Sequence, residues 1–273
     1  MSFSFYKTDN TLHFIDHGGY ESRNTSTIWC IKEADKIYKW KDFDIIKIYT
    51  GDTEDECDGI TNTYTYSNKT STYKTIPDFN FHAWPEVGIL DYNTFTHDIH
   101  LAGLEPTTYN KVGWIGNIDT NFIRKKAYEI SLDNKDIMDI TPMNWSGRTP
   151  QSESLQLNST KYLSTPDLVK RYSILIDIEG NGYSGRVKHL LWSHRPLIIV
   201  DRPHKEFFYD YLVPWTHYIP VKRDLSDLLH NIEWCFSNKT KARKIAENAY
   251  YFSQTHLTRD VAYKRWDEII SNR

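Results

Sequence analysis

The chain has 273 residues and a formal net charge of -3, with 25% charged and 39% hydrophobic residues. This balance is ordinary for a folded globular protein and excludes global disorder. The near-neutral charge argues against a large nucleic-acid footprint, so we expect no nucleic-acid partner. Aromatic residues are frequent at 15%, and Tyr and Trp present an apolar face with a polar tip. This bias suits a carbohydrate binder, although a Tyr-rich core would give the same count.

The three cysteines are far apart and match neither a disulfide framework nor a zinc-binding spacing. The first residues, MSFSFYKTDN, lack the basic start and apolar run of a signal peptide. No stretch approaches about 18 consecutive apolar residues, so no transmembrane segment is expected. From these features we expect a location in the cytoplasm. We also expect a monomer.

The first third of the chain predicts an irregular arrangement. A polar start, 1–20, precedes an amphipathic helix over 26–41 and an apolar strand over 42–50. The segment 53–80 is acidic and then rich in Thr, Tyr, Ser and Asn, which predicts a loop. The segment 81–104 matches no regular period.

Short apolar strands then alternate with helices. We expect strands over 112–118, 137–140, 172–178, 197–200 and 217–221. We expect helices over 122–129, 187–193, 225–232 and 242–252, and a last one from Thr258. Such alternation predicts an α/β protein with a parallel sheet covered on both faces.

The same pattern predicts two lobes. The first comprises residues 1–107, and the second comprises residues 108–250. The final segment, 251–273, is expected to be a helix that packs back on the first lobe.

A glycine-rich turn, EGNGYSGRVKH at 179–189, follows the buried strand. Its glycines allow a sharp turn and a close approach to a ligand. A helix beginning near Ser184 would point its N–H groups and positive dipole end at the turn, and Arg186 adds donors suited to phosphate. Because ligands bind at the carboxyl ends of parallel strands, the pattern predicts a phosphate site. A tight turn with a solvated arginine is the alternative.

The turn is not a Walker loop, since GxxxxGK[ST] is absent. Gly180, Gly182 and Gly185 do match G-x-G-x-x-G, the pattern of dinucleotide-binding turns. Asp201 would then be the acidic residue that binds the ribose. An NAD-dependent oxidoreductase is therefore an open alternative.

Three runs of sequence resemble glycosyltransferase family 90, which includes the protein O-glucosyltransferases and the fungal capsule-associated transferases. They are YSILIDIEGNGYSGRVKHLLWSHRPLIIVD, EFFYDYLVPWTHYIPVKRDLSDLLHNIEW and ARKIAENAYYFSQTHLT. The resemblance is strong over 172–260 and weaker over 108–170, and the string at 214–226 is its most specific part. It implies a GT-B architecture of two Rossmann-like lobes with parallel sheets, in which the C-terminal lobe holds a UDP-sugar.

The resemblance also implies the chemistry. Family members transfer a sugar from UDP-xylose or UDP-glucose to a hydroxyl group of an acceptor, and are typically inverting and metal-independent. The short chain is similar to members encoded by large algal viruses, which favours xylose, a glycan acceptor and a beta linkage. No cofactor and no metal is expected.

The family pattern assigns the donor site to the glycine-rich turn. Arg186 would contact the diphosphate and stabilise UDP as it leaves, in place of a metal. Further nucleotide contacts fall on Gly180, Gly182, Tyr183, Ser184 and Lys188. For Lys188 a solvated helix lysine is the alternative.

An inverting transfer needs a carboxylate that takes the proton of the attacking hydroxyl. The family places it just after a strand of the N-terminal lobe, where this chain has Asp52. Asp55, in the same acidic loop, is the second choice and a candidate sugar contact. Crowded carboxylates tend to raise one another's pKa, which suits a base. A solvated acidic loop is the alternative.

The family motif resembling Phe-Arg-Gly-Ser-Arg-Thr corresponds here to WIGNIDT at 114–120. Gly116 fits, but both arginines are missing, so Asn117 or Asp119 would bind the uridine or the sugar. Trp84 stands where members carry an aromatic residue near the acceptor. The missing arginines also leave open a non-catalytic carbohydrate-binding protein.

Two metal-binding patterns are weak. Asp177-Ile-Glu179 resembles the DxD of metal-dependent transferases but more often marks a strand end. His97-x-x-His100 lacks further ligands at zinc spacing.

Overall fold

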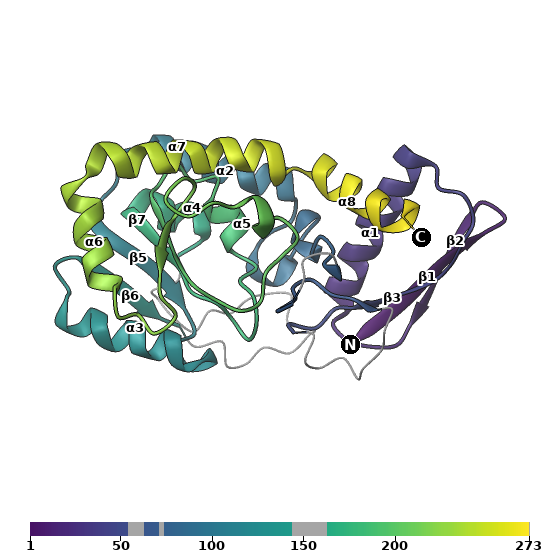
Figure 1. Cartoon of the computed structure of the whole chain (residues 1–273), viewed down its shortest axis with the longest axis horizontal. Coiled ribbons are helices and arrows are strands. Elements are labelled where there is room, and N and C mark those ends of the chain that lie inside the picture. The colour runs from purple at the N-terminus through teal and green to yellow at the C-terminus, as the bar shows by residue number, and fades with distance from the viewer. Residues whose placement is uncertain (54–62, 71–73, 144–162, 273) are drawn as a thin grey trace. The chain divides into compact units, whose positions relative to one another are not determined.

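The computed structural model describes residues 1–53, 63–70, 74–143 and 163–272. These residues form two compact units with a sheet in each (Figure 1). Unit 1 comprises Met1–Asn93, Pro203–Asp210 and His256–Arg273, and unit 2 comprises Thr94–Arg202 and Tyr211–Thr255.

The units differ from the ranges 1–107 and 108–250 at three places, one of which is that unit 2 extends to Thr255. Most of the helix at 92–104 belongs to unit 2, because Thr94 is the first residue of that unit. The segment 203–210 belongs to unit 1, where Lys205 forms a β-bridge with Asn68. A short segment that joins the other unit in this way shows no periodic pattern in the sequence.

The sheet of unit 1 has the order β2-β1-β3-β4. Its strands are β1 (Ser2–Thr8), β2 (Thr11–Asp16), β3 (Phe43–Tyr49) and β4 (Thr63–Tyr64). β1 runs antiparallel to both β2 and β3, and β3 runs parallel to β4. Asp9 and Asn10 both have positive φ, at 50° and 58°, and make a two-residue hairpin that can join only antiparallel strands. The parallel sheet expected for both lobes is therefore found in unit 2 only.

Two long helices belong to unit 1, α1 (Glu21–Tyr38) and α8 (Arg259–Ser271), and they pack against each other. Two short 3₁₀ helices, η3 (Phe79–Phe81) and η4 (Pro85–Val87), lie between β4 and the end of the unit's first segment. The Thr258 side chain accepts a hydrogen bond from the Val261 amide and caps α8. The Trp266 indole meets the Phe5 ring edge-on at 6.1 Å, which ties α8 to the sheet.

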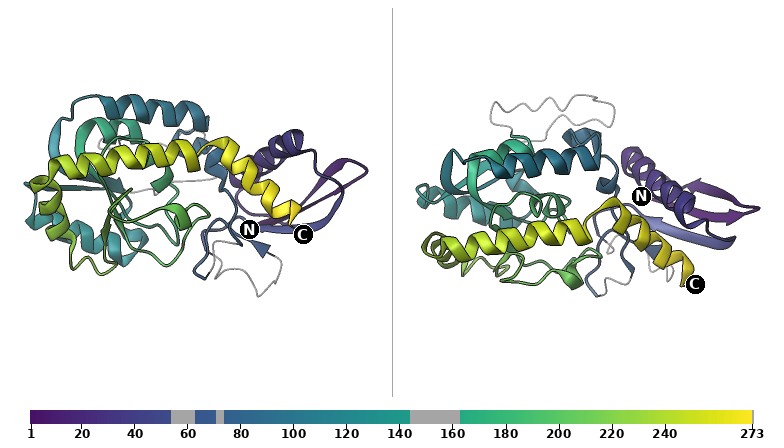
Figure 2. Two further views of the ribbon diagram at one scale, coloured as in Figure 1. Left: turned by 45° about the horizontal axis from the view of Figure 1, so that its top comes forward. Right: turned by 90° about the horizontal axis from the view of Figure 1, so that it is seen from above.

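The sheet of unit 2 has the order β6-β5-β7-β8-β9, and all its neighbouring strands are parallel. Helices surround this sheet (Figures 1 and 2). The strands are β5 (Tyr109–Gly116), β6 (Met138–Pro142), β7 (Tyr172–Asp177), β8 (Leu197–Val200) and β9 (Ile219–Val221). The sheet confirms the expected α/β class.

Helices cover both faces of this sheet. They are α2 (Tyr92–Leu104), α3 (Phe122–Asp133), α4 (Thr165–Arg171), α5 (Val187–Leu190), α6 (Leu228–Ser237) and α7 (Lys239–His256). The 3₁₀ helix η5 (Ile118–Thr120) follows β5, and the 3₁₀ helix η6 (Tyr209–Tyr211) stands where the chain passes from unit 1 to unit 2, between Asp210 and Tyr211. Ile174, Ile176 and Ile178 face one core with α3 and α6. α4 and α5 pack against β7. No helix in the described part of the chain is long and apolar enough to cross a membrane.

Parallel strands end at the same edge of a sheet, so four loops of unit 2 meet at one edge. They follow β5, β7, β8 and β9 and carry the polar residues described next.

Candidate functional site

The glycine-rich turn after β7 is closed by its own backbone. The Gly180 amide donates to the Tyr183 carbonyl at 2.9 Å, and a Cβ on Gly180 would lie only 3.1 Å from that oxygen. The helix expected near Ser184 begins at Val187 and has four residues. It is too short to present a helix dipole, so the positive potential here comes from side chains.

Asp177, the last residue of β7, fixes the turn to the sheet. Its Oδ1 accepts a hydrogen bond from Ser184 Oγ at 2.7 Å, and its Oδ2 accepts one from Arg202 Nη2 at 2.5 Å. The side chains of Arg202 and Asp177 are 0% and 1% exposed. Such a buried pair holds only when both charges keep their partners.

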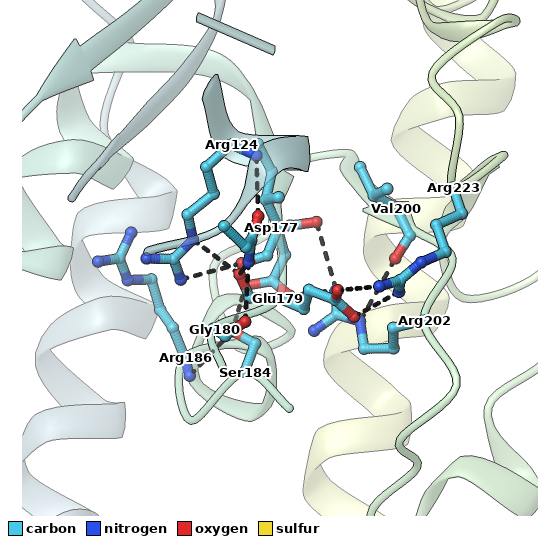
Figure 3. A network of polar contacts seen from close by, with 11 residues as sticks. Arg124, Asp177, Glu179, Gly180, Ser184, Arg186, Val200, Arg202 and Arg223 are labelled. Atoms are coloured by element: carbon cyan, nitrogen blue, oxygen red, sulfur yellow. Dashed lines mark hydrogen bonds and ion pairs between the residues drawn. The ribbon is translucent and has the colours of Figure 1, made fainter. Parts of the chain in front are cut away.

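Glu179 opens the turn and is held by Arg223, from the loop after β9. Arg223 Nη2 and Nη1 meet the two carboxylate oxygens at 2.6 and 2.7 Å, a bidentate fork (Figure 3). The Glu179 side chain is 6% exposed and that of Arg223 is 44% exposed. Because β8 lies between β7 and β9, the fork spans the end of β8.

Arg124, in the first turn of α3, joins the loop after β5 to the glycine-rich turn. Its Nε donates to the Glu179 carbonyl at 2.7 Å and its Nη1 to the Asn117 carbonyl at 3.2 Å. Asn121 Nδ2 donates to the Gly180 carbonyl at 2.8 Å. Burial, and then the charge of Arg186, lower the pKa of Arg124 to about 10, so it is still charged at neutral pH.

Arg186 and Lys188 lie at the end of the turn. Arg186 Nη1 donates to the Ile115 carbonyl at 2.7 Å, and Lys188 Nζ donates to the Gly185 carbonyl at 3.2 Å. Lys188 is 0% exposed, so it is not a solvated helix lysine. Burial, and then the charges of Lys188 and Arg186, lower the pKa of His189 well below its ordinary value, which leaves its imidazole neutral.

The charges of this cluster do not balance. Five cationic side chains and two carboxylates leave it with a formal charge of three positive units. Its members are Arg124, Arg186, Lys188, Arg202, Arg223, Asp177 and Glu179. Each carboxylate is bonded to its own arginine. The arrangement therefore favours an anionic ligand at the edge of the sheet.

The loop after β5 lies beside the turn, as the bonds of Arg186 and Arg124 show. A Cβ on Gly116 would fall 2.6 Å from the Trp114 ring, so this position requires glycine. Asn117 Oδ1 accepts from the Asp119 amide at 2.9 Å and caps η5, and Asp119 is exposed. Although this loop lacks the arginines of the family motif, Arg124 brings a guanidinium to it, 5.1 Å from the Trp114 ring.

In unit 1, Asp52 follows β3 as the sequence predicts. Arg23 Nη1 contacts Asp52 Oδ1 at 2.8 Å and also donates to the Thr50 carbonyl at 3.1 Å. The Asp52 side chain is 28% exposed, so it is oriented by Arg23 and reachable from solvent. A Cβ on Gly51 would lie 2.1 Å from the Tyr49 hydroxyl, which explains the glycine before Asp52.

Trp84 precedes η4 in unit 1 and is partly exposed. Its ring meets Phe79 edge-on at 5.2 Å, and its backbone bridges to Ile89. One side of the indole is thus used for packing. Asp55 lies outside the described residues.

Sequence reasoning missed the roles of Arg124, Arg202 and Arg223. Arg202 and Arg223 each stand two residues after the end of a parallel strand, β8 and β9. That position could have identified both, since the carboxyl ends of these strands meet at the ligand edge.

Neither metal-binding pattern gains support. The carboxylates of Asp177 and Glu179 are bonded to arginines, and His100 Nδ1 lies 2.8 Å from His194 Nε2. Among the described residues, no group of three or more His, Cys, Asp and Glu could hold a metal ion. Independence from metals stays a prediction.

Asp201 directly follows β8, where a dinucleotide site would place its acidic residue, and is exposed. The four-residue α5 does not supply the long helix that opens at a dinucleotide-binding turn. The geometry therefore favours a smaller phosphate-bearing ligand.

A family model described as glycosyl transferase family 90 matches residues 31–272. The uncharacterized protein 035R of Invertebrate iridescent virus 3 is 33% identical over 152 residues, which are 52% of this chain and 14% of that protein. Protein O-glucosyltransferase 2 of Danio rerio is 32% identical over 154 residues, which are 56% of this chain and 30% of that protein. The chain thus spans less than a third of the length of these relatives.

Among solved structures, the crystal structure of Anabaena HepE in complex with UDP matches with a TM-score of 0.39 and 11% identity. The match covers 70% of this chain and 47% of that chain. The crystal structure of TarM matches with a TM-score of 0.44 and 12% identity, over 78% of this chain and 40% of that chain. Likeness of this size is too small to assign a site.

Proposed function

Because the chain belongs to glycosyl transferase family 90, we propose that it transfers a sugar from a UDP-sugar to a hydroxyl group of a glycan acceptor. The observation that carries the proposal is the cluster of excess positive charge around the glycine-rich turn, at the ligand edge of the parallel sheet. A nucleoside diphosphate supplies the negative charge that this cluster lacks.

We assign the donor diphosphate to the turn 180–186. Arg186, near the end of this turn, supplies a guanidinium, and Lys188 and Arg124 add two more positive charges. These charges stabilise the negative charge that develops on UDP as it leaves. These cations do what a metal ion does in other transferases, so the reaction requires neither metal nor cofactor. Gly182, Tyr183 and Ser184 line the nucleotide through the backbone, and Gly116, Asn117 and Asp119 lie on the neighbouring loop.

We assign the base to Asp52. In the proposed step the acceptor oxygen attacks the anomeric carbon, the bond from that carbon to the UDP oxygen breaks, and Asp52 takes the hydroxyl proton. A single displacement inverts the anomeric centre and gives a beta linkage from an alpha-linked donor. Arg23 holds the carboxylate in one orientation, which suits a base that must meet one hydroxyl. Trp84 and Asp55 stay candidate contacts to the acceptor or the sugar.

For the donor sugar we propose xylose first and glucose second. The likeness to the iridescent virus protein supports a member of the viral type, and the likeness to protein O-glucosyltransferase 2 supports glucose. The rates of transfer from UDP-xylose and from UDP-glucose distinguish the two.

The test is UDP release from UDP-xylose and UDP-glucose, in EDTA, with a panel of mono- and oligosaccharide acceptors. The proposal predicts release that depends on both donor and acceptor and that continues in EDTA. No release above the level of Asp52→Asn with either donor would overturn it. Sugar binding without UDP binding would instead favour the non-catalytic carbohydrate-binding protein.

A further inference from the structure

The fork between Arg223 and Glu179 has a role beyond holding the loops together. We infer that Arg223 is a positioning residue that neutralises Glu179, so that the glycine-rich turn can accept a diphosphate. The inference rests on the proposed function, because it takes the ligand of the turn to be a UDP group.

The backbone of Glu179 is held at the start of the glycine-rich turn. Its backbone carbonyl accepts hydrogen bonds from Arg124 Nε at 2.7 Å and from Asn121 Nδ2 at 3.0 Å. Glu179 directly precedes Gly180 in the sequence, and its side chain is 6% exposed. A poorly solvated carboxylate in that position repels an arriving diphosphate unless a cation is bonded to it.

Arg223 is presented by an ordered turn. The Lys222 amide donates to Asp227 Oδ1 at 2.9 Å, the Leu225 amide donates to the Lys222 carbonyl at 2.9 Å, and the Ser226 amide donates to Asp224 Oδ1 at 3.0 Å. From this turn, both terminal nitrogens of Arg223 reach the two oxygens of Glu179. Bonds to both oxygens make the pair stronger and fix its geometry, which keeps the positive charge of Arg223 on the Glu179 carboxylate.

The same arrangement occurs once more at this edge. Asp177 is bonded to Arg202, which follows β8 as Arg223 follows β9. The Asp177–Arg202 pair is buried, so its loss should destabilise the folded protein. Arg223, in contrast, is 44% exposed. Substitutions that change the charge of the Glu179–Arg223 pair should therefore leave the protein folded.

The test is calorimetric titration of UDP and of uridine into the wild type, Arg223→Ala, Glu179→Gln and the double variant. Arg223→Ala is expected to weaken UDP binding about tenfold, the size expected of one partly screened like charge, and to leave uridine binding unchanged. Adding Glu179→Gln is expected to restore most of the UDP affinity. Glu179→Gln alone is expected to bind UDP at least as tightly as the wild type.

Arg243→Ala is the matched control, because Arg243 is an 84% exposed arginine of α7 in the same unit. It should leave both affinities unchanged. A double variant as weak as Arg223→Ala would mean that Arg223 contacts the phosphates itself, and would overturn the inference. Weaker uridine binding in Arg223→Ala, or weaker UDP binding in Glu179→Gln, would overturn it too. A wild type that binds no UDP would contradict the proposed function instead.

Discussion

The glycine-rich turn of unit 2 and the Asp52 loop of unit 1 hold their charges in different ways. The turn gathers five cations and two carboxylates, most of them buried and bonded to backbone carbonyls or to one another. The Asp52 loop has one partly exposed carboxylate and one arginine. The first arrangement suits a site that keeps a fixed charge through the reaction, and the second suits a group that exchanges a proton with a substrate.

The largest effect is expected from Asp52→Asn, which removes the proposed base and keeps the shape of the side chain. Transfer should fall about 10²- to 10⁴-fold, because general base catalysis contributes roughly that much, while the affinity for UDP stays unchanged. Steady-state rates and UDP titration measure the two effects. Asp44→Asn, at an exposed position of β3, is the control. Activity retained in Asp52→Asn would move the base elsewhere.

Arg202→Ala should destabilise the protein, because it leaves Asp177 buried without its cation. Breaking a buried pair in this way costs about 3–5 kcal/mol of the free energy of unfolding, which urea titration measures. The double variant Asp177→Asn with Arg202→Met should recover part of the loss. Equal stability of Arg202→Ala and the wild type would show that the pair does not anchor the turn.

Arg186→Ala tests the proposed role of the glycine-rich turn in binding the donor. Loss of one preorganised donor to the leaving group should lower kcat about 10²- to 10³-fold. Arg186→Lys keeps the charge and should lose less. A rise in KM with kcat unchanged would mean that Arg186 binds the ground state and the transition state equally well. That result would contradict the assignment.

Ser184→Ala is expected to have the smallest effect. The hydroxyl donates to Asp177 inside the turn, so its loss should cost about 1 kcal/mol of stability and raise the Kd for UDP a few-fold. Thermal unfolding and UDP titration check both values. Ser237→Ala, at the exposed end of α6, should change neither. A UDP affinity that is lost completely would mean that the hydroxyl contacts the ligand.

The same contrast explains what the sequence could predict of the fold. In unit 2, β7 and β8 are continuous apolar runs, because helices cover both faces of the sheet, and such runs are easily recognised. In unit 1, β1 begins with alternating Ser and Phe and is followed by a polar turn. This segment lacks a continuous apolar run, so the sequence predicts an irregular start. The Asp9-Asn10 pair is the hairpin signal that identifies it.

Helix α2 was missed for a different reason. It carries His97, Asp98 and His100 among its apolar residues and ends near Gly103, so no clean period marks it. A Cβ on Gly103 would fall 2.0 Å from the Ser193 carbonyl, and this close approach explains the glycine.

Of the candidate site, the glycine-rich turn could be predicted from its local pattern, and the place of Asp52 from the family resemblance. The strand ends could also have placed Arg202 and Arg223 at the ligand edge. The bonding partners of Arg124, Arg202 and Arg223 could not be predicted, because each bond joins segments that are 25 or more residues apart. Only the order of the strands brings these arginines to one edge.

The glycine-rich turn is proposed to hold the diphosphate of UDP without a metal ion. Calorimetric titration of the wild type in EDTA with UDP, uridine and NAD tests it most directly. We expect UDP to bind more tightly than uridine and NAD to give no binding heat. UDP binding no tighter than that of uridine, or NAD binding tighter than that of UDP, would contradict it.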